Sequence, residues 1–218
     1  MSDKTPDHLD FAALMCSRLC HDLVGPVGAV ANGAELLAEG DADMLADAQA
    51  LIANSAGQAV RRLRFYRVAF GASGAASIGW AEALQTAGAY LADHKVHLET
   101  TGDITGEGGA AQGILIKVVL NAMLVCAGGI PRGGTMAVQL TGDQAAPRII
   151  IEASGPMVGA EPNALEALDQ GQKSGSLDGI DARAAQPFML GQLASANGLA
   201  ATIDTADPAR LVMAIGSA

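Results

Sequence analysis

The first forty residues carry apolar side chains at the spacing of one long amphipathic helix. Steps of three and four residues place side chains along a single stripe of a helix. A helix is therefore expected from about His8 to Glu39, preceded by a polar tail at residues 1–7 and ended by a break at residues 40–43. The members of this apolar row are Ala12, Cys16, Leu19, Leu23, Val27, Val30, Ala34 and Leu37.

A second apolar row follows the break and predicts an antiparallel helical hairpin. Asp43 is suited to be the N-cap of this second helix. Two long helices with a short connection pack side by side, so residues 1–70 are predicted to form one hairpin domain. The members of the second row are Leu45, Ala48, Ile52, Ala56, Ala59, Leu63, Tyr66 and Phe70.

The apolar face of this hairpin is wider than one partner helix can cover. We expect a second copy of the chain to cover the rest, which gives a homodimer with a four-helix bundle. The alternative is that the C-terminal half of the same chain covers this face. The residues that widen the face are Phe11, Met15, Leu36, Leu51 and Val60.

His21 stands outside the first apolar row and is the main candidate for chemistry. At about 100° per residue it lies roughly 200° from both Leu19 and Leu23, so its imidazole is expected to face solvent. Asp22 follows directly, and a carboxylate beside one ring nitrogen fixes the tautomer and leaves the other nitrogen as a nucleophile. We interpret the pair as a phosphate-accepting histidine with its orienting carboxylate. An inert surface histidine is the alternative.

The residues after His21 indicate a shaped surface that a partner can approach. Pro26 removes the helix bond to the carbonyl of residue 22 and bends the axis, at a cost of about 3 kcal/mol. Gly25 and Gly28 lie on the face of His21, although each costs roughly 1 kcal/mol in helix propensity. The predicted docking face for a partner consists of Leu14, Ser17, Arg18, Val24, Gly25 and Gly28.

A basic cluster on the second helix is expected at the height of His21. His21 lies about 19 residues, or roughly 28 Å, before the turn, and the same height on the second helix is near Arg61. Residues 60–67 read Val-Arg-Arg-Leu-Arg-Phe-Tyr-Arg, the densest basic cluster in a chain of net charge -10. Arg61 and Arg64 are candidate contacts for an acidic partner or a phosphoryl group. A solvated helix face is the alternative.

The segment at residues 71–77 is small and flexible in composition and predicts an interdomain linker. Helical and strand patterns alternate in the remaining residues 78–218. This order predicts an α/β sandwich, with one mixed sheet and helices on one of its faces. Helices are expected near residues 78–93, 109–126, 163–169 and 184–197, and strands near residues 96–100, 135–140, 148–153, 200–204 and 211–215.

Composition restricts the partners and the compartment. A pI near 4.6 argues against nucleic acid and against anionic membranes as partners. Three cysteines, a polar N-terminus and the lack of a long apolar run predict a cytoplasmic protein. A metal site formed by Cys16, Cys20 and His21 is not expected, because Cys16 belongs to the apolar row and Cys20 suits helix packing.

The pattern His21-Asp22-x-x-x-Pro26, on the first helix of a hairpin, resembles the phosphoacceptor box of histidine kinases. That resemblance implies a dimerisation and phosphotransfer hairpin. The second domain is similar to the ATP-binding (Bergerat) fold of the same kinases. Residues 118–122 (Val-Val-Leu-Asn-Ala) resemble the kinase box that contributes a magnesium ligand, and residues 151–156 (Ile-Glu-Ala-Ser-Gly-Pro) lie where their first glycine box is expected.

Departures from the kinase pattern argue against nucleotide chemistry. Ala153 stands where the kinases have the Asp that bonds adenine, and Met157 stands where they have a glycine. Residues 181–188 (Asp-Ala-Arg-Ala-Ala-Gln-Pro-Phe) lack the glycine-rich loop whose backbone cradles phosphates. Asn121 is either a leftover magnesium ligand or a hydrogen-bonded helix residue. We therefore expect a degenerate ATPase-like domain that binds no ATP.

A kinase architecture without nucleotide chemistry resembles the ChpT-type histidine phosphotransferases, over nearly the whole chain. Residues 18–22 (Arg-Leu-Cys-His-Asp) and 67–72 (Arg-Val-Ala-Phe-Gly-Ala) fit this family. The resemblance implies a phosphorelay in which His21 takes a phosphoryl group from the receiver domain of a CckA-like hybrid kinase. CtrA-like and CpdR-like response regulators then accept it, and the receiver supplies Mg²⁺. An ATP-dependent kinase and a non-catalytic dimeric scaffold are the alternatives.

Overall fold

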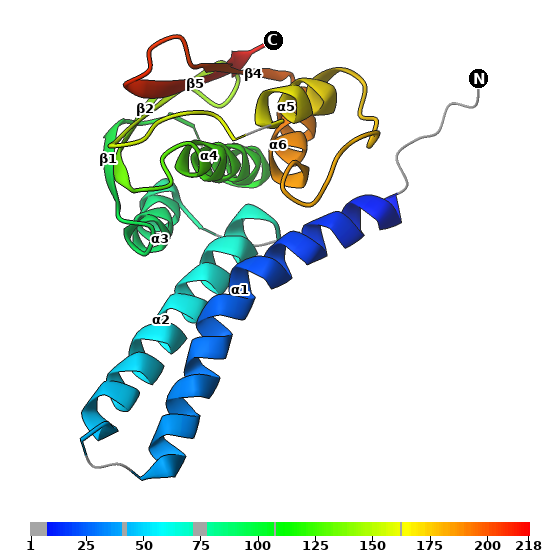
Figure 1. Cartoon of the computed structure of the whole chain (residues 1–218). Helices are drawn as coiled ribbons and strands as arrows, with labels where there is room; N and C mark the ends of the chain where they lie inside the picture. The colour runs from blue at the N-terminus through cyan, green and yellow to red at the C-terminus, as the bar shows by residue number, and fades with distance from the viewer. Residues whose placement is uncertain (1–7, 41–42, 72–77, 107, 162) are drawn as a thin grey trace.

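The computed structural model describes residues 8–40, 43–71, 78–106, 108–161 and 163–218. The predicted tail at residues 1–7 and the predicted linker from residue 72 onward lie outside these ranges. The described chain forms a helical hairpin that projects from a mixed α/β domain (Figure 1).

The hairpin consists of α1 (His8–Glu39) and α2 (Leu45–Ala69). The predicted bounds of α1 are confirmed. Met44 occupies the N-cap position of α2 in a helical conformation, without a side-chain cap bond. The prediction of Asp43 as N-cap is therefore wrong, because the turn extends one residue further than the polar residues indicated.

The face of α1 that packs against α2 is rotated from the predicted row. Met15, Pro26 and Gly33 are the buried residues of α1. A Cβ on Gly33 would lie 2.6 Å from Cγ1 of Ile52, so only a glycine permits this approach of the two helices. Four members of the predicted row are instead exposed, namely Ala12, Cys16, Val27 and Ala34. The close contact is made at Gly33, a residue that an apolar periodicity does not reveal.

The C-terminal domain contains every helix and strand that the sequence predicted, with ends shifted by a few residues. Its strands form one mixed sheet in the order β1-β2-β3-β5-β4. The β1–β2 pair is parallel and the other pairs are antiparallel. The helices are α3 (Trp80–Ala92), α4 (Ala110–Gly128), α5 (Ala164–Lys173) and α6 (Ala185–Ser195), and the strands are β1 (Val96–Gly102), β2 (Gly134–Gly142), β3 (Pro147–Ser154), β4 (Leu199–Asp204) and β5 (Arg210–Ser217).

The helices cover one face of the sheet, as predicted (Figure 1). Buried and more exposed residues alternate along β2 and β3, as in a sheet with one covered face. The central helix α4 is apolar on nearly all sides and carries much of the core. Among the described residues it is the one helix long and apolar enough to cross a membrane, but here it is packed inside the domain.

The hairpin and the C-terminal domain share one hydrophobic core at their joint. Phe65 and Ala69 near the end of α2 are buried with residues of α3 and α4. At the start of α1, Phe11 packs on Phe188 of α6, with ring centroids 5.6 Å apart. The C-terminal domain therefore covers the part of the hairpin next to it. The alternative to dimerisation predicted this covering by the same chain.

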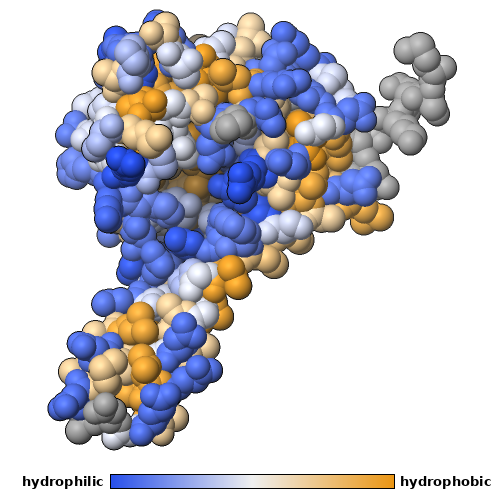
Figure 2. Space-filling view, viewed as in Figure 1, coloured by the Kyte–Doolittle hydropathy of each residue, from blue (hydrophilic) through white to orange (hydrophobic). Residues whose placement is uncertain are grey.

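The projecting part of the hairpin keeps apolar side chains at its surface (Figure 2). Val27 of α1 is 56% exposed and Leu63 of α2 is 53% exposed. Neither side chain is covered by the C-terminal domain, so this surface remains available to a second copy of the chain.

Candidate functional site

His21 lies in the middle of α1 with its ring in solvent, as predicted. Its side chain is 80% exposed, whereas that of the adjacent Asp22 is 20% exposed. The ring Nδ1 lies 3.4 Å from Oδ1 of Asp22. In the tautomer that donates from Nδ1, the lone pair of Nε2 is free to attack an electrophile.

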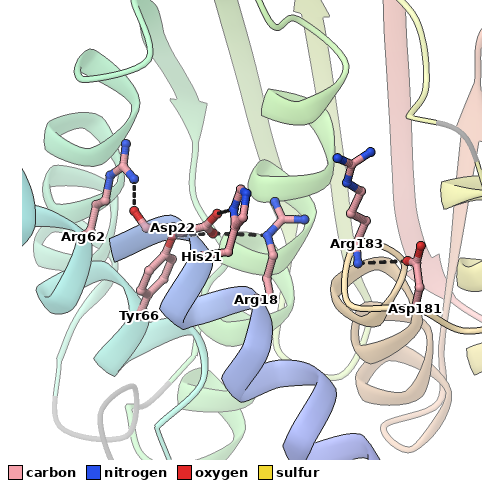
Figure 3. Close-up of polar contacts among 7 residues, drawn as sticks. All are labelled: Arg18, His21, Asp22, Arg62, Tyr66, Asp181 and Arg183. Atoms are coloured by element: carbon pink, nitrogen blue, oxygen red, sulfur yellow. Dashed lines mark hydrogen bonds and ion pairs between the residues drawn. The ribbon is translucent and has the colours of Figure 1, made fainter. Parts of the chain in front are cut away.

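The carboxylate of Asp22 is held from two helices. Arg18, one turn earlier in α1, donates from Nε to Oδ2 at 3.1 Å. The hydroxyl of Tyr66 in α2 donates to the same oxygen at 2.9 Å. Because both donors use Oδ2, Oδ1 is left facing His21 (Figure 3). The arrangement fixes the carboxylate before any partner arrives.

Burial and charge keep both of these donors in their donating forms. Burial lowers the pKa of Arg18, but the charge and hydrogen bond of Asp22 outweigh it, and the net pKa is raised. Burial raises the pKa of Tyr66, and Tyr90 and Asp22 raise it further. The guanidinium and the phenol therefore stay protonated beside Asp22.

Pro26 shapes the site in the way the sequence predicted, and α2 compensates for it. Pro26 lacks the N–H that would bond the carbonyl of Asp22 in a regular helix. Arg62 donates from Nη1 to that carbonyl instead. The freed acceptor is thus satisfied, and the backbone that carries His21 is tied to α2.

The residues of the predicted docking face lie around His21 on α1. Val24 is 66% exposed. A Cβ built on Gly25 or Gly28 would meet no atom within 4 Å, so nothing in the described chain requires a glycine at either position. Ser17 is exposed and Leu14 is half-buried. Arg18 points to Asp22, so part of its charge is already used within the chain.

Arg61 and Arg64 lie on the side of α2 that faces α3. The two arginines line a groove of about 520 Å³ between these helices. Arg61 also forms a two-pronged ion pair with Asp93, with Nη2 and Oδ1 2.6 Å apart and Nε and Oδ2 2.9 Å apart. The predicted height of the basic cluster is right to within one residue, but the arginine that reaches the backbone of Asp22 is Arg62.

Two residues at the site and one in the turn before α6 were not assigned a role from the sequence. Arg62 belonged to the basic cluster but was not singled out, and Tyr66 was read only as a member of an apolar row. Arg183 lies in the stretch where the glycine-rich loop is missing. Figure 3 shows its guanidinium pointing in the same direction as the side chains of His21 and Arg18. Nothing in the sequence signals that this loop approaches α1.

The two cysteines near His21 are both exposed, which corrects their assignment to buried positions. Cys16 and Cys20 belong to the outer side of α1 because the packed stripe is rotated. Within the described ranges, no group of three or more His, Cys, Asp or Glu side chains is placed to hold a metal ion.

The residues that the kinase resemblance connects with adenine and magnesium are engaged inside the domain. Ala153 is fully buried in β3. Asn121 is fully buried as well, and its Nδ2 donates to the carbonyls of Ala69 and Lys117. Gln186 of α6 donates to the backbone carbonyl of Asn121, so α6 packs directly against α4. The Nδ2 bonds fit the hydrogen-bonded helix residue, whereas Oδ1, the atom that a magnesium ion would bind, is buried without a hydrogen-bond partner among the described residues.

The turn before α6 holds a carboxylate where the kinases hold phosphates. Oδ1 of Asp181 accepts the backbone N–H groups of Arg183 and Ala184 at 2.9 Å and 2.8 Å (Figure 3). Ala184 is the N-cap of α6, and N–H groups at a helix start attract anions. The two N–H groups are satisfied here by a residue that already carries negative charge.

The comparisons with known proteins agree with this arrangement. Residues 80–209 match the family described as Histidine phosphotransferase C-terminal domain. The protein phosphotransferase ChpT of Brucella abortus (strain 2308) is 42% identical over 201 residues, which cover 89% of this chain and 90% of that protein. A solved bacterial phosphotransferase is 37% identical, with a TM-score of 0.81 over 99% of this chain and 100% of that one. The chain therefore belongs to the ChpT-type histidine phosphotransferase family.

Proposed function

We propose that His21 carries a phosphoryl group between the receiver domains of two-component signalling proteins. The observation that carries this proposal is the exposed imidazole of His21, with Nδ1 against the fixed carboxylate of Asp22. An exposed ring serves a nucleophile that must meet another protein, because the reacting atoms have to approach within about 3 to 3.5 Å.

The transfer is a pair of displacements at phosphorus. Nε2 of His21 attacks the phosphorus of a receiver's aspartyl phosphate, the P–O bond to the aspartate breaks, and that aspartate leaves as a carboxylate. In the second step an aspartate oxygen of another receiver attacks the phosphorus, the P–N bond breaks, and neutral His21 returns. Asp22 holds the Nδ1 proton throughout and stabilises the positive charge that the ring gains.

The partners are proposed from the family resemblance. We expect the donor to be the receiver of a CckA-like hybrid kinase and the acceptors to be CtrA-like and CpdR-like response regulators. We expect each receiver to supply the Mg²⁺ that balances the charge on the phosphoryl group. The cytoplasm, where such regulators act, is the expected compartment.

We further propose that the C-terminal domain is a degenerate ATPase-like domain that does not bind ATP. Two described features support this: a buried methyl group at Ala153, and the carboxylate of Asp181 in the turn before α6. An ATP-dependent kinase would need an adenine acceptor and an open anion site at these positions.

Labelling of His21 is the experiment that tests the phosphotransfer function. A receiver phosphorylated with radioactive phosphate is incubated with the wild-type chain and with His21→Gln. The wild type should take up the label and His21→Gln should not. His21→Gln should keep its melting temperature, because the exposed ring contributes little packing.

Two results would contradict the proposal, and they favour different alternatives. Label on the wild type that survives His21→Gln would place the acceptor elsewhere. No label on a folded wild type would favour the non-catalytic dimeric scaffold. His97→Gln is a suitable control, because His97 is also an exposed histidine but lies on β1, and it should take up label like the wild type.

A further inference from the structure

We propose that Tyr66 is a positioning residue for phosphoryl transfer, and that Tyr90 of the C-terminal domain holds the ring of Tyr66 in place by packing against it. Tyr66 acts through Asp22, whose carboxylate it fixes against His21. The inference rests on the proposed function, because it explains how one ring nitrogen of His21 is selected for phosphorylation.

The chain contains 2 tyrosines, and both lie at this joint. Tyr66 comes from α2 and Tyr90 from α3, with ring centroids 5.9 Å apart. Tyr90 also stacks on Phe65, with centroids 4.4 Å apart. Both tyrosine rings are buried, so their hydroxyls have few alternative partners. A phenylalanine would fill the same space at position 66, so what the tyrosine adds there is the hydroxyl that bonds Asp22.

The direction of the hydrogen bonds is set by the number of protons available. Tyr66 has one hydroxyl proton, and it is donated to Oδ2 of Asp22 at 2.9 Å. The ring of Tyr90 packs against the ring of Tyr66, and this contact keeps the Tyr66 hydroxyl aimed at the carboxylate.

The hydrogen bonds to Asp22 decide which ring nitrogen of His21 keeps its proton. Oδ2 of Asp22 accepts from Tyr66 and from Nε of Arg18, so both of those donors pull on the same oxygen. The remaining oxygen, Oδ1, can only accept from Nδ1 of His21, because the Asp22 carboxylate is ionised and donates nothing. Nδ1 is thereby held as the N–H, and Nε2 is left with its lone pair in solvent.

The Tyr66 hydroxyl is well suited to this task. Burial and the nearby charge of Asp22 raise the pKa of Tyr66, so the phenol does not ionise in the working range. A hydrogen bond to a charged group in a buried setting is also among the stronger ones in proteins. The contact is therefore permanent, unlike the exposed contact between Asp22 and His21.

Tyr90 gives the C-terminal domain a direct part in the site. It belongs to α3, and its ring is packed in the core shared by the two domains. A domain without nucleotide chemistry thus supports the transfer site through a single side chain. This role requires the joint between α2 and α3 and no ligand.

Nitrogen NMR of labelled histidines tests the proposal directly. The chain has 4 histidines, and the nitrogen signals of His21 are identified as those missing from the spectrum of His21→Gln. Tyr66→Phe keeps the ring and removes the hydroxyl. We expect the share of the Nδ1–H tautomer of His21 to fall and the rate of phosphoryl transfer at saturating receiver to drop on the order of tenfold. The receiver concentration for half-maximal rate should stay unchanged, because Tyr66 is buried away from the partner.

Three further variants complete the experiment. Asp22→Asn should shift the tautomer at least as far as Tyr66→Phe, whereas Tyr90→Phe keeps the packing ring and should leave the tautomer unchanged. Thr86→Val removes a hydroxyl that lies one turn from Tyr90 on α3 and bonds to the carbonyl of Glu82. It should leave both the tautomer and the rate at wild-type values.

The outcomes separate this inference from the proposed function. A wild-type tautomer in Tyr66→Phe overturns the inference, whether or not the rate falls, because a fall in rate alone would be a general structural effect. In that case the tautomer of His21 in Asp22→Asn still shows whether Asp22 orients the ring. Labelling that survives His21→Gln overturns the proposed function itself, independently of both tyrosines.

Discussion

Arg62 of α2 donates to the backbone carbonyl of Asp22, the acceptor that Pro26 leaves without a helix partner. The two features are therefore coupled: a proline that weakens α1 is compensated by an arginine on the neighbouring helix. Sequence spacing alone identified the free carbonyl. Only the packed hairpin identifies the side chain that reaches it.

This coupling predicts a non-additive pair of substitutions. Arg62→Met should lower the free energy of unfolding by about 1 to 3 kcal/mol, because it leaves a carbonyl unsatisfied. In a Pro26→Ala background the helix supplies its own N–H, and Arg62→Met should cost at least about 1 kcal/mol less. Urea denaturation of the four chains measures the cycle. Equal losses in both backgrounds would show that Arg62 does not replace the missing bond.

Receiver docking should depend on the open surface beside His21. Val24→Glu or Gly28→Arg should weaken receiver binding by on the order of 2 kcal/mol or more, as at the centre of an interface. Neither change should lower the melting temperature, since Val24 is exposed and a Cβ on Gly28 meets no atom within 4 Å. Calorimetric titration with a receiver measures the loss.

Two control substitutions define the limits of the receiver-binding surface beside His21. Arg64→Ala, at an exposed position on the far side of α2 from Arg62, should give a smaller loss that shrinks as salt is added. Gly33→Ala should instead destabilise the hairpin, because its Cβ would lie 2.6 Å from Ile52. Full transfer rates in both Val24→Glu and Gly28→Arg would show that receivers approach His21 from another direction.

The exposed apolar side chains on the projecting hairpin should be covered by a second copy of the chain. Light scattering should give twice the chain mass of 21.9 kDa. Val27→Glu combined with Leu63→Glu should produce a monomer, because charged side chains are costly in a closed bundle. Leu165→Glu, at an exposed leucine on α5, should leave the dimer intact. A wild-type monomer at nanomolar concentration would rule the bundle out.

Adenine nucleotides should not bind at millimolar concentration. Calorimetry with ATP and Mg²⁺ should show no binding heat for the wild type, nor for Ala153→Asp. The aspartate alone should not restore binding, because Asp181 still occupies the start of α6 and Gln186 still joins α6 to α4. Micromolar affinity in the wild type would contradict the argument and favour the kinase alternative.

The sequence predicted the elements of this protein well because they depend on local pattern. The bounds of α1, the hairpin, the mixed sheet and the exposed His21 all follow from periodicity and turn residues. The packed stripe of α1 was only partly right, because Gly33 and Pro26 are buried but carry no apolar signal, and the close approach to α2 is made at Gly33. Periodicity finds large side chains, whereas this contact is made by small ones.

The environment of the site was predictable only in part, since contacts between distant segments leave no local signal. The height of the basic cluster came from helix geometry, which is why Arg62 was missed by only one residue. Which arginine turns inward depends on the rotation of α2, and that rotation is set by the core at its end. The partner of Arg61 is Asp93, beyond the linker, and no spacing rule relates the two.

The ion pair between Arg61 and Asp93 sits close to the stacked rings of Phe65 and Tyr90, so α3 is anchored to α2 at two heights. A domain that carries its own phosphoryl donor has to swing toward its target histidine and away again. Two anchors on one short helix resist such a swing. Under the proposed function the donor arrives on another protein, so a domain anchored in this way does not hinder transfer and leaves the approach to His21 open.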